Sequence, residues 1–218
     1  MGKKVAVVLS GCGVFDGAEI YESVITLLEL DKAGAEVTCM APDIDQHKVV
    51  NHLTNTESNE KRNVLVESAR VARGQIFNIK GAKANDFDAL ILPGGFGAAL
   101  NNCTFALAGP DGEVNADVAS LVQDFYKSGK PIGAMCIAPT LLALVLKGEK
   151  VKLTIGSDEG VAGGIEALGN IHVNCTTDEI AVDEDRKIVT TPAYMTAGSI
   201  SEASVGITKL VKKILELA

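Results

Sequence analysis

The sequence predicts a doubly wound α/β fold, in which a mainly parallel β-sheet carries helices on both faces. Continuous apolar runs, such as residues 5–9 and 89–92, are typical of strands buried on both faces of a parallel sheet. Segments with helical spacing separate these runs, and this alternation is typical of flavodoxin-like domains. Since no repeat or linker divides the 218 residues, 47% of which are hydrophobic, we expect one domain over residues 1–218.

The first half of the chain predicts two strands and two helices. A strand over residues 5–9 is followed by a glycine-rich loop over 10–17 and a helix over about 17–33. The inner stripe of this helix consists of four apolar residues at helical spacing: Ile20, Val24, Leu27 and Leu28. A second strand covers 35–41, a loop without clear periodicity covers 43–58, and Asn59 caps a second helix that ends near Gly74.

The second half predicts further strands over residues 88–92, up to Cys136, 151–155 and 188–191. Helices over about 114–127 and 199–217 complete the alternation. In a doubly wound sheet, ligands gather at the carboxyl ends of the strands. We therefore expect the loops over 11–17 and 94–97 and the turn at Cys136 to form the site.

Cys136 is the candidate nucleophile. It lies between an apolar run that rises from Lys130 and a helix start at Pro139, with Ala134 and Ala138 two residues to either side. This small-x-Cys-x-small pattern is typical of a sharp strand-to-helix elbow, and a helix N-terminus favours the reactive thiolate. A buried, unreactive cysteine is the alternative, and the elbow alone favours neither interpretation.

Two glycines and two carboxylates are the next candidates. Gly94 and Gly95 follow a buried strand, so their N–H groups can stabilise an oxyanion, although a plain tight turn explains them equally well. Glu19 and Glu22 lie on one side of the first helix, where acidic residues also interact favourably with the helix dipole. A carboxylate beside a thiolate is unfavourable, so a glutamate close to Cys136 is expected to be protonated or to act as a base.

Charge and composition exclude several classes of function. The net charge of −8 argues against nucleic acids and anionic membranes as partners. The early apolar run is too short for a signal peptide or a membrane span, so the cytoplasm is the expected compartment. Five cysteines without a C-x-x-C pair fit reduced thiols rather than disulfides or structural zinc. The histidines form no metal-binding pattern, so no metal is expected: His47, His52 and His172.

The loop Gly11-x-Gly13-x-x-x-Gly17 is a weak match to the dinucleotide fingerprint, because three residues instead of two precede its last glycine. We therefore expect no nucleotide cofactor. His52 and Arg62 can face the site from the segment after the second strand, but solvated polar residues are the more ordinary interpretation.

Together the motifs resemble a known family. Pro93-Gly94-Gly95, Ala134-Met135-Cys136-Ile137-Ala138-Pro139 and Gly17-Ala18-Glu19-Ile20-Tyr21-Glu22 are similar to the PfpI/deglycase group of the class I glutamine amidotransferase-like superfamily. The resemblance extends essentially over the whole chain. It implies a flavodoxin-like fold, a homodimer and a glyoxalase that converts a small dicarbonyl or aldehyde, chiefly glyoxal and secondarily methylglyoxal, to a hydroxy acid such as glycolate without a cofactor. Such an activity can reflect protein deglycase action.

Transferred by motif, Cys136 takes the nucleophile position, Glu22 the acid beside it and Gly95 an oxyanion-donor position. We expect six residues around the substrate or its oxyanion: Gly94, Gly95, Ile137, Cys12, Glu19 and Arg62. Amidotransferases use Cys-His-Glu, and related deglycases carry a histidine about twenty residues after the cysteine, where this chain has Gly156. Amide hydrolysis without that imidazole loses much of its acid–base catalysis, so no competent glutaminase or peptidase is expected.

Addition to an aldehyde requires fewer catalytic groups than amide hydrolysis does. A thiolate adds to glyoxal without expelling a leaving group, and Glu22 can move a proton between the adjacent carbons through an enediol. The competing interpretation is a catalytically weak ligand-binding or redox-sensing module, because a cysteine of low pKa is easily oxidised and Cys12 could be its partner.

Overall fold

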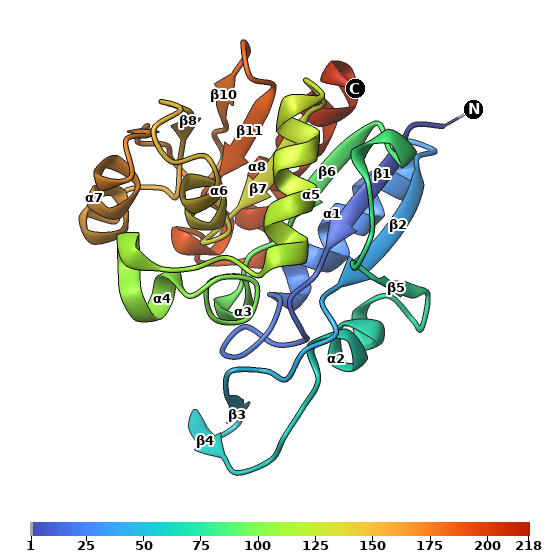
Figure 1. Ribbon diagram of the computed structural model, residues 1–218, viewed down its shortest axis with the longest axis vertical. Helices are drawn as coiled ribbons and strands as arrows, with labels where there is room; N and C mark the ends of the chain where they lie inside the picture. Colours follow the sequence, from blue (N-terminus) through green and yellow to red (C-terminus); the bar gives the residue numbers. More distant parts are fainter. Residues whose placement is uncertain (1) are drawn as a thin grey trace.

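The computed structural model describes residues 2–218 and confirms the doubly wound α/β fold (Figure 1). The central sheet is built from β1 (Lys4–Val8), β2 (Glu36–Ala41), β5 (Ile76–Asn78), β6 (Ala89–Leu92), β7 (Ile132–Met135), β10 (Ala181–Asp183) and β11 (Ile188–Thr191). Their order across the sheet is β10-β11-β7-β6-β1-β2-β5. Neighbouring strands pair in parallel, apart from the antiparallel pair of β10 and β11.

Helices cover both faces of this sheet. One face packs against α1 (Ile20–Lys32), α2 (Val64–Val71) and α8 (Ile200–Leu217). The other packs against α3 (Phe96–Leu100), α4 (Phe105–Ala108), α5 (Ala116–Lys127), α6 (Pro139–Val145) and α7 (Glu159–Ala167). Figure 1 shows α5 and α6 in front of the sheet and α1 and α8 behind it. Side chains of β1 alternate between the two hydrophobic cores, which explains why its whole run is apolar. No helix within residues 2–218 has the length and apolarity to cross a bilayer.

Residues 151–155 do not form a strand of the central sheet as predicted. Instead β8 (Lys152–Leu153) pairs with β9 (Ile171–His172) in a separate two-stranded parallel sheet. Val151, Leu153 and Ile155 are nevertheless fully buried. The apolar residues at alternate positions of this segment therefore predicted burial correctly. They did not indicate which strand the segment would pair with.

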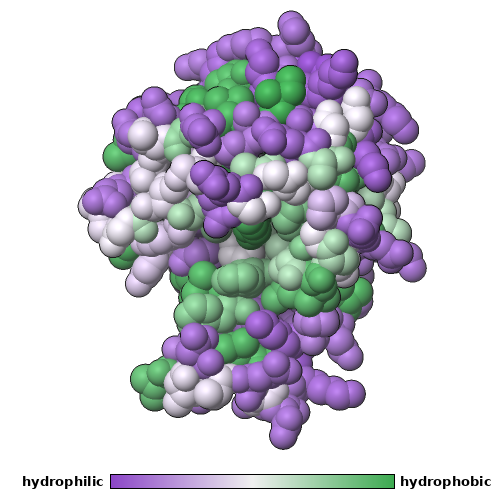
Figure 2. Space-filling view, turned by 90° about the vertical axis from the view of Figure 1, so that its left-hand side faces the viewer, coloured by the Kyte–Doolittle hydropathy of each residue, from purple (hydrophilic) through white to green (hydrophobic). Residues whose placement is uncertain are grey.

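The segment predicted as a loop over residues 43–58 contains a hairpin of β3 (Val49–Asn51) and β4 (Thr56–Ser58). It forms the projection at the lower end of the molecule in Figure 1 and in the space-filling view of Figure 2. The predicted cap at Asn59 is wrong, because Asn63 accepts the Val66 N–H (3.0 Å). Backbone hydrogen bonds from Gln46 to Arg62 and from Val64 to Ile44 hold the chain extended up to the start of α2.

The predicted inner stripe of α1 is also wrong. Ile20, Val24 and Leu28 are between 42% and 47% exposed, and Leu27 is only partly buried. The buried face instead carries Glu22, Ser23, Ile25, Thr26 and Leu30. The hydroxyls of this face are satisfied inside the core, Ser23 by a backbone carbonyl and Thr26 by a sulfur. The helix is thus turned so that Glu22, on its buried side, reaches the ends of β6 and β11.

Candidate active site

Cys136 lies at the predicted elbow, between the end of β7 and the start of α6. Its φ of +58° is left-handed, which costs a residue with a side chain about 1–2 kcal/mol. The Cys136 N–H donates to the Thr191 carbonyl at the end of β11 (3.1 Å), and this bond helps to hold the turn. The cysteine is buried, with 7% of its surface exposed.

Glu22 is the polar group beside this sulfur. Its side chain is fully buried, and it lies close enough to the Cys136 thiol for each group to shift the pKa of the other. Its two carboxyl oxygens accept the N–H groups of Gly94 (2.9 Å) and Tyr194 (3.1 Å). A Cβ on Gly94 would lie 2.4 Å from the Cys136 Cβ and 2.8 Å from the Glu22 Oε2. Only glycine fits between the two groups, which explains this position of the Pro-Gly-Gly motif.

Burial dominates the electrostatics of the pair. Burial, followed by the charge of Glu19, raises the pKa of Glu22 to about 8. Burial and then Glu22 raise the pKa of Cys136 well above that of an ordinary thiol, although the N–H groups of Gly95 and Ile137 lower it. The thiolate favoured by the sequence is therefore not the resting form. Glu22 is mainly protonated at neutral pH, as expected, and the pair titrates as one coupled unit.

The main-chain donors around the sulfur differ in availability. The Gly94 N–H is engaged by Glu22, so it is not available to an oxyanion as predicted. The N–H groups of Gly95 and Ile137 lie close enough to the Cys136 sulfur to lower its pKa. When a carbonyl carbon bonds to that sulfur, its oxygen comes within reach of these two donors.

Glu19 influences the sulfur indirectly, through its contact with Glu22. Its carboxylate caps α1 by accepting the Glu22 N–H (2.6 Å), and its own N–H donates to the Gly94 carbonyl (2.9 Å). It is buried, and this burial raises its pKa. Glu19 therefore positions Glu22 and disfavours its ionisation. A carboxylate at the start of α1 also leaves no place there for a pyrophosphate, which disfavours the dinucleotide alternative.

Cys12 and Arg62 lie outside the cluster around Cys136. Cys12 is half-buried near Glu67, and Arg62 forms ion pairs with Glu60 (2.8 Å) and Glu67 (3.7 Å). Cys12 follows β1, which β6 separates from β7 in the sheet. The contact of Cys12 and Arg62 with the substrate stays a prediction.

The three histidines are also remote from the pair. Ring nitrogens of His52 and His172 accept backbone N–H groups of Phe15 and Ile155. Gly156, at the position where related deglycases have histidine, is buried, and a Cβ there would lie 2.7 Å from Thr196 Cγ2. The chain is closed to an imidazole at this point. Within residues 2–218, no three His, Cys, Asp or Glu side chains lie together as a metal site would require.

Sequence reasoning missed the turn after β11. Tyr194 donates its N–H to Glu22, and its ring lies 6.1 Å from that of Tyr21. Ala193 has a φ of +43°, so the turn is unusually sharp for a residue with a side chain. Pro192, directly after a buried strand, indicated a turn at the carboxyl edge of the sheet. It did not indicate a contact with Glu22, because Tyr194 contributes a backbone N–H, which no side-chain pattern reveals.

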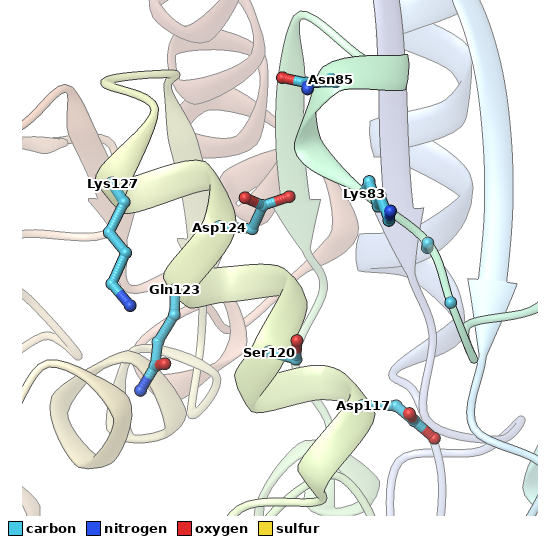
Figure 3. Close-up of a pocket in the computed structure, with 9 residues that line it drawn as sticks. Lys83, Asn85, Asp117, Ser120, Gln123, Asp124 and Lys127 are labelled. Carbon is cyan, nitrogen blue, oxygen red and sulfur yellow. The ribbon is translucent and has the colours of Figure 1, made fainter.

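A cavity of about 530 Å³ lies far from this pair, between residues 81–85 and α5 (Figure 3). Its lining mixes both charges: Gly81, Ala82, Lys83, Asn85, Asp117, Ser120, Gln123, Asp124 and Lys127. Asp124 is occupied as an acceptor of the Ala84 N–H (2.7 Å). None of the predicted site residues lines it.

A model of the DJ-1/PfpI family matches residues 3–197. The chain belongs to the DJ-1/PfpI family. It is 46% identical to the human "Glutamine amidotransferase-like class 1 domain-containing protein 3, mitochondrial", over 98% of this chain and 83% of that protein. The rat "ES1 protein homolog, mitochondrial" is likewise 46% identical, over 98% of this chain and 84% of its own length.

Solved structures of the DJ-1/PfpI family agree with the fold. An Ehrlichia chaffeensis protein, described as an isoprenoid biosynthesis protein with amidotransferase-like domain, superimposes with a TM-score of 0.91 at 36% identity, covering 99% of this chain and 100% of that one. Drosophila melanogaster DJ-1beta has a TM-score of 0.55 at 22% identity, covering 100% of this chain and 96% of its own. The latter likeness concerns the fold alone.

Proposed function

We propose that this DJ-1/PfpI protein is a cysteine-dependent glyoxalase of the ElbB (enhancing lycopene biosynthesis) type, which converts glyoxal, and secondarily methylglyoxal, to the hydroxy acid without a cofactor. The carbonyl of a glycated group is the equivalent deglycase substrate. The observation that carries the proposal is the buried pair of Cys136 and Glu22, which lie against Gly94 on either side, with the N–H groups of Gly95 and Ile137 near the sulfur.

The first step is addition to an aldehyde. Ionised Glu22 accepts the thiol proton as the Cys136 sulfur bonds to the aldehyde carbon, and the carbonyl electron pair moves to oxygen. The resulting oxyanion accepts hydrogen bonds from Gly95 and Ile137 and then takes the thiol proton from Glu22, which gives the neutral hemithioacetal and leaves Glu22 ionised for the next step. Because no bond to a leaving group breaks, this step needs no imidazole as general acid.

The second step moves a proton between neighbouring carbons. Glu22 removes the proton from the carbon bonded to sulfur and returns it to the adjacent carbon through an enediol, which leaves a thioester. Water then cleaves the thioester, releasing glycolate and the thiol. One carbon is oxidised and its neighbour is reduced, so glyoxal and one water together give glycolate and a proton. A carboxyl group with a pKa of about 8 is suited to accepting and returning protons near neutral pH.

Kinetics of three variants test the proposal. Cys136→Ala is expected to abolish glyoxal turnover, and Glu22→Gln to reduce it by about 10²-fold or more. Cys39→Ala, at a buried cysteine in β2, is the matched control and should retain it. For the wild type, kcat/KM is expected to rise with pH up to about 8, and Glu22→Gln should lose that rise.

Full activity of Cys136→Ala would refute this mechanism. Negligible turnover by the wild type, together with reversible oxidation of Cys136 by peroxide, would favour the sensor instead. The raised pKa of Cys136 weighs against that alternative, since oxidation follows the thiolate form.

A homodimer through α1 is part of the proposal. Ile20, Tyr21, Val24 and Leu28 expose between 42% and 48% of their surfaces on the outer face of this helix. Four large apolar side chains on adjacent turns are typical of an interface rather than of a solvated helix face. Val24→Asp is expected to shift the molecular mass measured by light scattering from dimer to monomer. A monomeric wild type would contradict the interface.

The cytoplasm is retained as the proposed compartment because all five cysteines are free. The human and rat relatives are named mitochondrial. Fractionation of the producing cells, with the protein in an organelle fraction, would contradict the proposal.

A further inference from the structure

A second cavity, of about 400 Å³, adjoins the turn that follows β11. Its volume falls within the range of small-molecule sites, about 300–1,000 Å³. Three loops line it, and their residues are Ser157, Asn174, Cys175, Thr176, Thr177, Glu179 and Thr196. The proposed mechanism uses none of these residues.

The turn over residues 191–196 connects this cavity with the catalytic pair. Thr191 accepts the Cys136 N–H at one end, Tyr194 donates its N–H to Glu22, and Thr196 lines the cavity at the other end. Since β7 and β11 are neighbouring strands that pair in parallel, the turn after β11 lies beside the Cys136 elbow at the same edge of the sheet.

The lining is rich in hydroxyl groups and carries one carboxylate. Thr177 donates its hydroxyl to that of Thr196 (2.9 Å). The side chains of Ser157 and Asn174 are exposed, so both can donate to and accept from a ligand in the cavity. Glu179 adds a carboxylate, and no lysine or arginine lines the cavity. This composition suits a neutral polyol and disfavours a phosphate or carboxylate.

We propose that this cavity is a subsite for the polyhydroxylated tail of a sugar-derived vicinal dicarbonyl, whose aldehyde carbon reacts at Cys136. The inference rests on the proposed glyoxalase function and names its substrate class. The sulfur bonds to the aldehyde carbon, one proton moves to the neighbouring ketone carbon through the enediol, and water cleaves the thioester. The product is a polyhydroxy acid, formed by internal oxidation and reduction with one water added.

Glucosone, a vicinal dicarbonyl with the carbon chain of glucose, is the probe. Asn174→Ala and Ser157→Ala are each expected to lower kcat/KM for glucosone by about 2- to 10-fold through a lost hydrogen bond, while the value for glyoxal stays within twofold. Gln123→Ala and Ser120→Ala, in the remote cavity of Figure 3, are matched controls and should change neither value.

The outcomes separate the subsite from the activity. Turnover of glyoxal without turnover of glucosone, or equal losses for both substrates in the variants, overturns the subsite and leaves the glyoxalase function standing. If the wild type converts neither substrate, the activity fails, and the subsite is decided by binding of erythritol, an unreactive four-carbon polyol. A concentration-dependent NMR shift of the Asn174 side-chain amide supports the subsite, and an unchanged spectrum overturns it.

Discussion

Replacing Glu22 with glutamine is expected to change how the free energy of unfolding depends on pH. In the unfolded chain the carboxyl ionises above its ordinary pKa of 4.5, whereas in the folded protein it keeps its proton up to about 8. Its stabilising contribution is therefore complete below 4.5 and is lost as the pH rises through about 8. Glutamine does not titrate, so the variant lacks this loss.

The magnitude follows from the two pKa values. The rise from 4.5 to about 8, at about 1.4 kcal/mol for each pH unit, corresponds to a stability loss of about 5 kcal/mol in the wild type over that range. Glutamine has a single acceptor oxygen, so either Gly94 or Tyr194 loses its partner, at a cost of about 1–3 kcal/mol. The wild type is therefore more stable at low pH and the variant at high pH, and the curves cross about one to two pH units above 4.5.

Urea unfolding of both proteins from acid to mildly alkaline pH measures this difference directly. Glu29→Gln is the control, because Glu29 lies on the same helix and pairs with Lys32 at the surface (2.8 Å). Its curve should run parallel to that of the wild type. A difference between the wild type and Glu22→Gln that stays constant with pH would show that Glu22 is already ionised in the folded protein, and would refute the reasoning.

Two further substitutions test local features, each against a neighbour that should tolerate change. Gly94→Ala is expected to cost about 1–3 kcal/mol and to impair turnover, because the new Cβ meets Cys136 and Glu22, whereas Gly163→Ala, with open space around it in α7, should be neutral or stabilising by up to about 1 kcal/mol. Asn63→Ala should destabilise by about 1 kcal/mol through the lost cap of α2, and Asn59→Ala should have no effect; thermal unfolding that shows the reverse order in either pair would contradict the assignment.

The fold was predictable because its strands are buried on both faces and its helices are not. The elbow was predictable because small residues on both sides of Cys136 leave few other arrangements for the chain. The orientation of α1 was not, since hydrophobic periodicity assumes that the buried face is apolar. Here Glu22 occupies that face for chemical reasons, and the apolar residues are left outside.

The rest of the site depends on information that side-chain patterns do not carry. Arg62 was predicted to face the site from the segment after the second strand, yet it pairs there with Glu60 and Glu67. Tyr194 contributes a backbone N–H, which every residue except proline possesses. Burial raises the pKa of Cys136. The position at a helix N-terminus predicted a lowered pKa, and that prediction has the wrong direction because the sequence does not show how deeply the thiol is buried.

The loops beneath the catalytic pair touch one another through main-chain atoms. A Cβ on Gly97 would lie 2.5 Å from the Ser10 carbonyl oxygen and 2.6 Å from the Gly17 Cα, so no side chain separates them. Substitutions at these contact positions are therefore restricted, because there is no space for a larger side chain. New substrate preferences would have to arise from the outer rim, at the turn after β11 and at Ser157 and Asn174, while the chemistry beneath stays fixed.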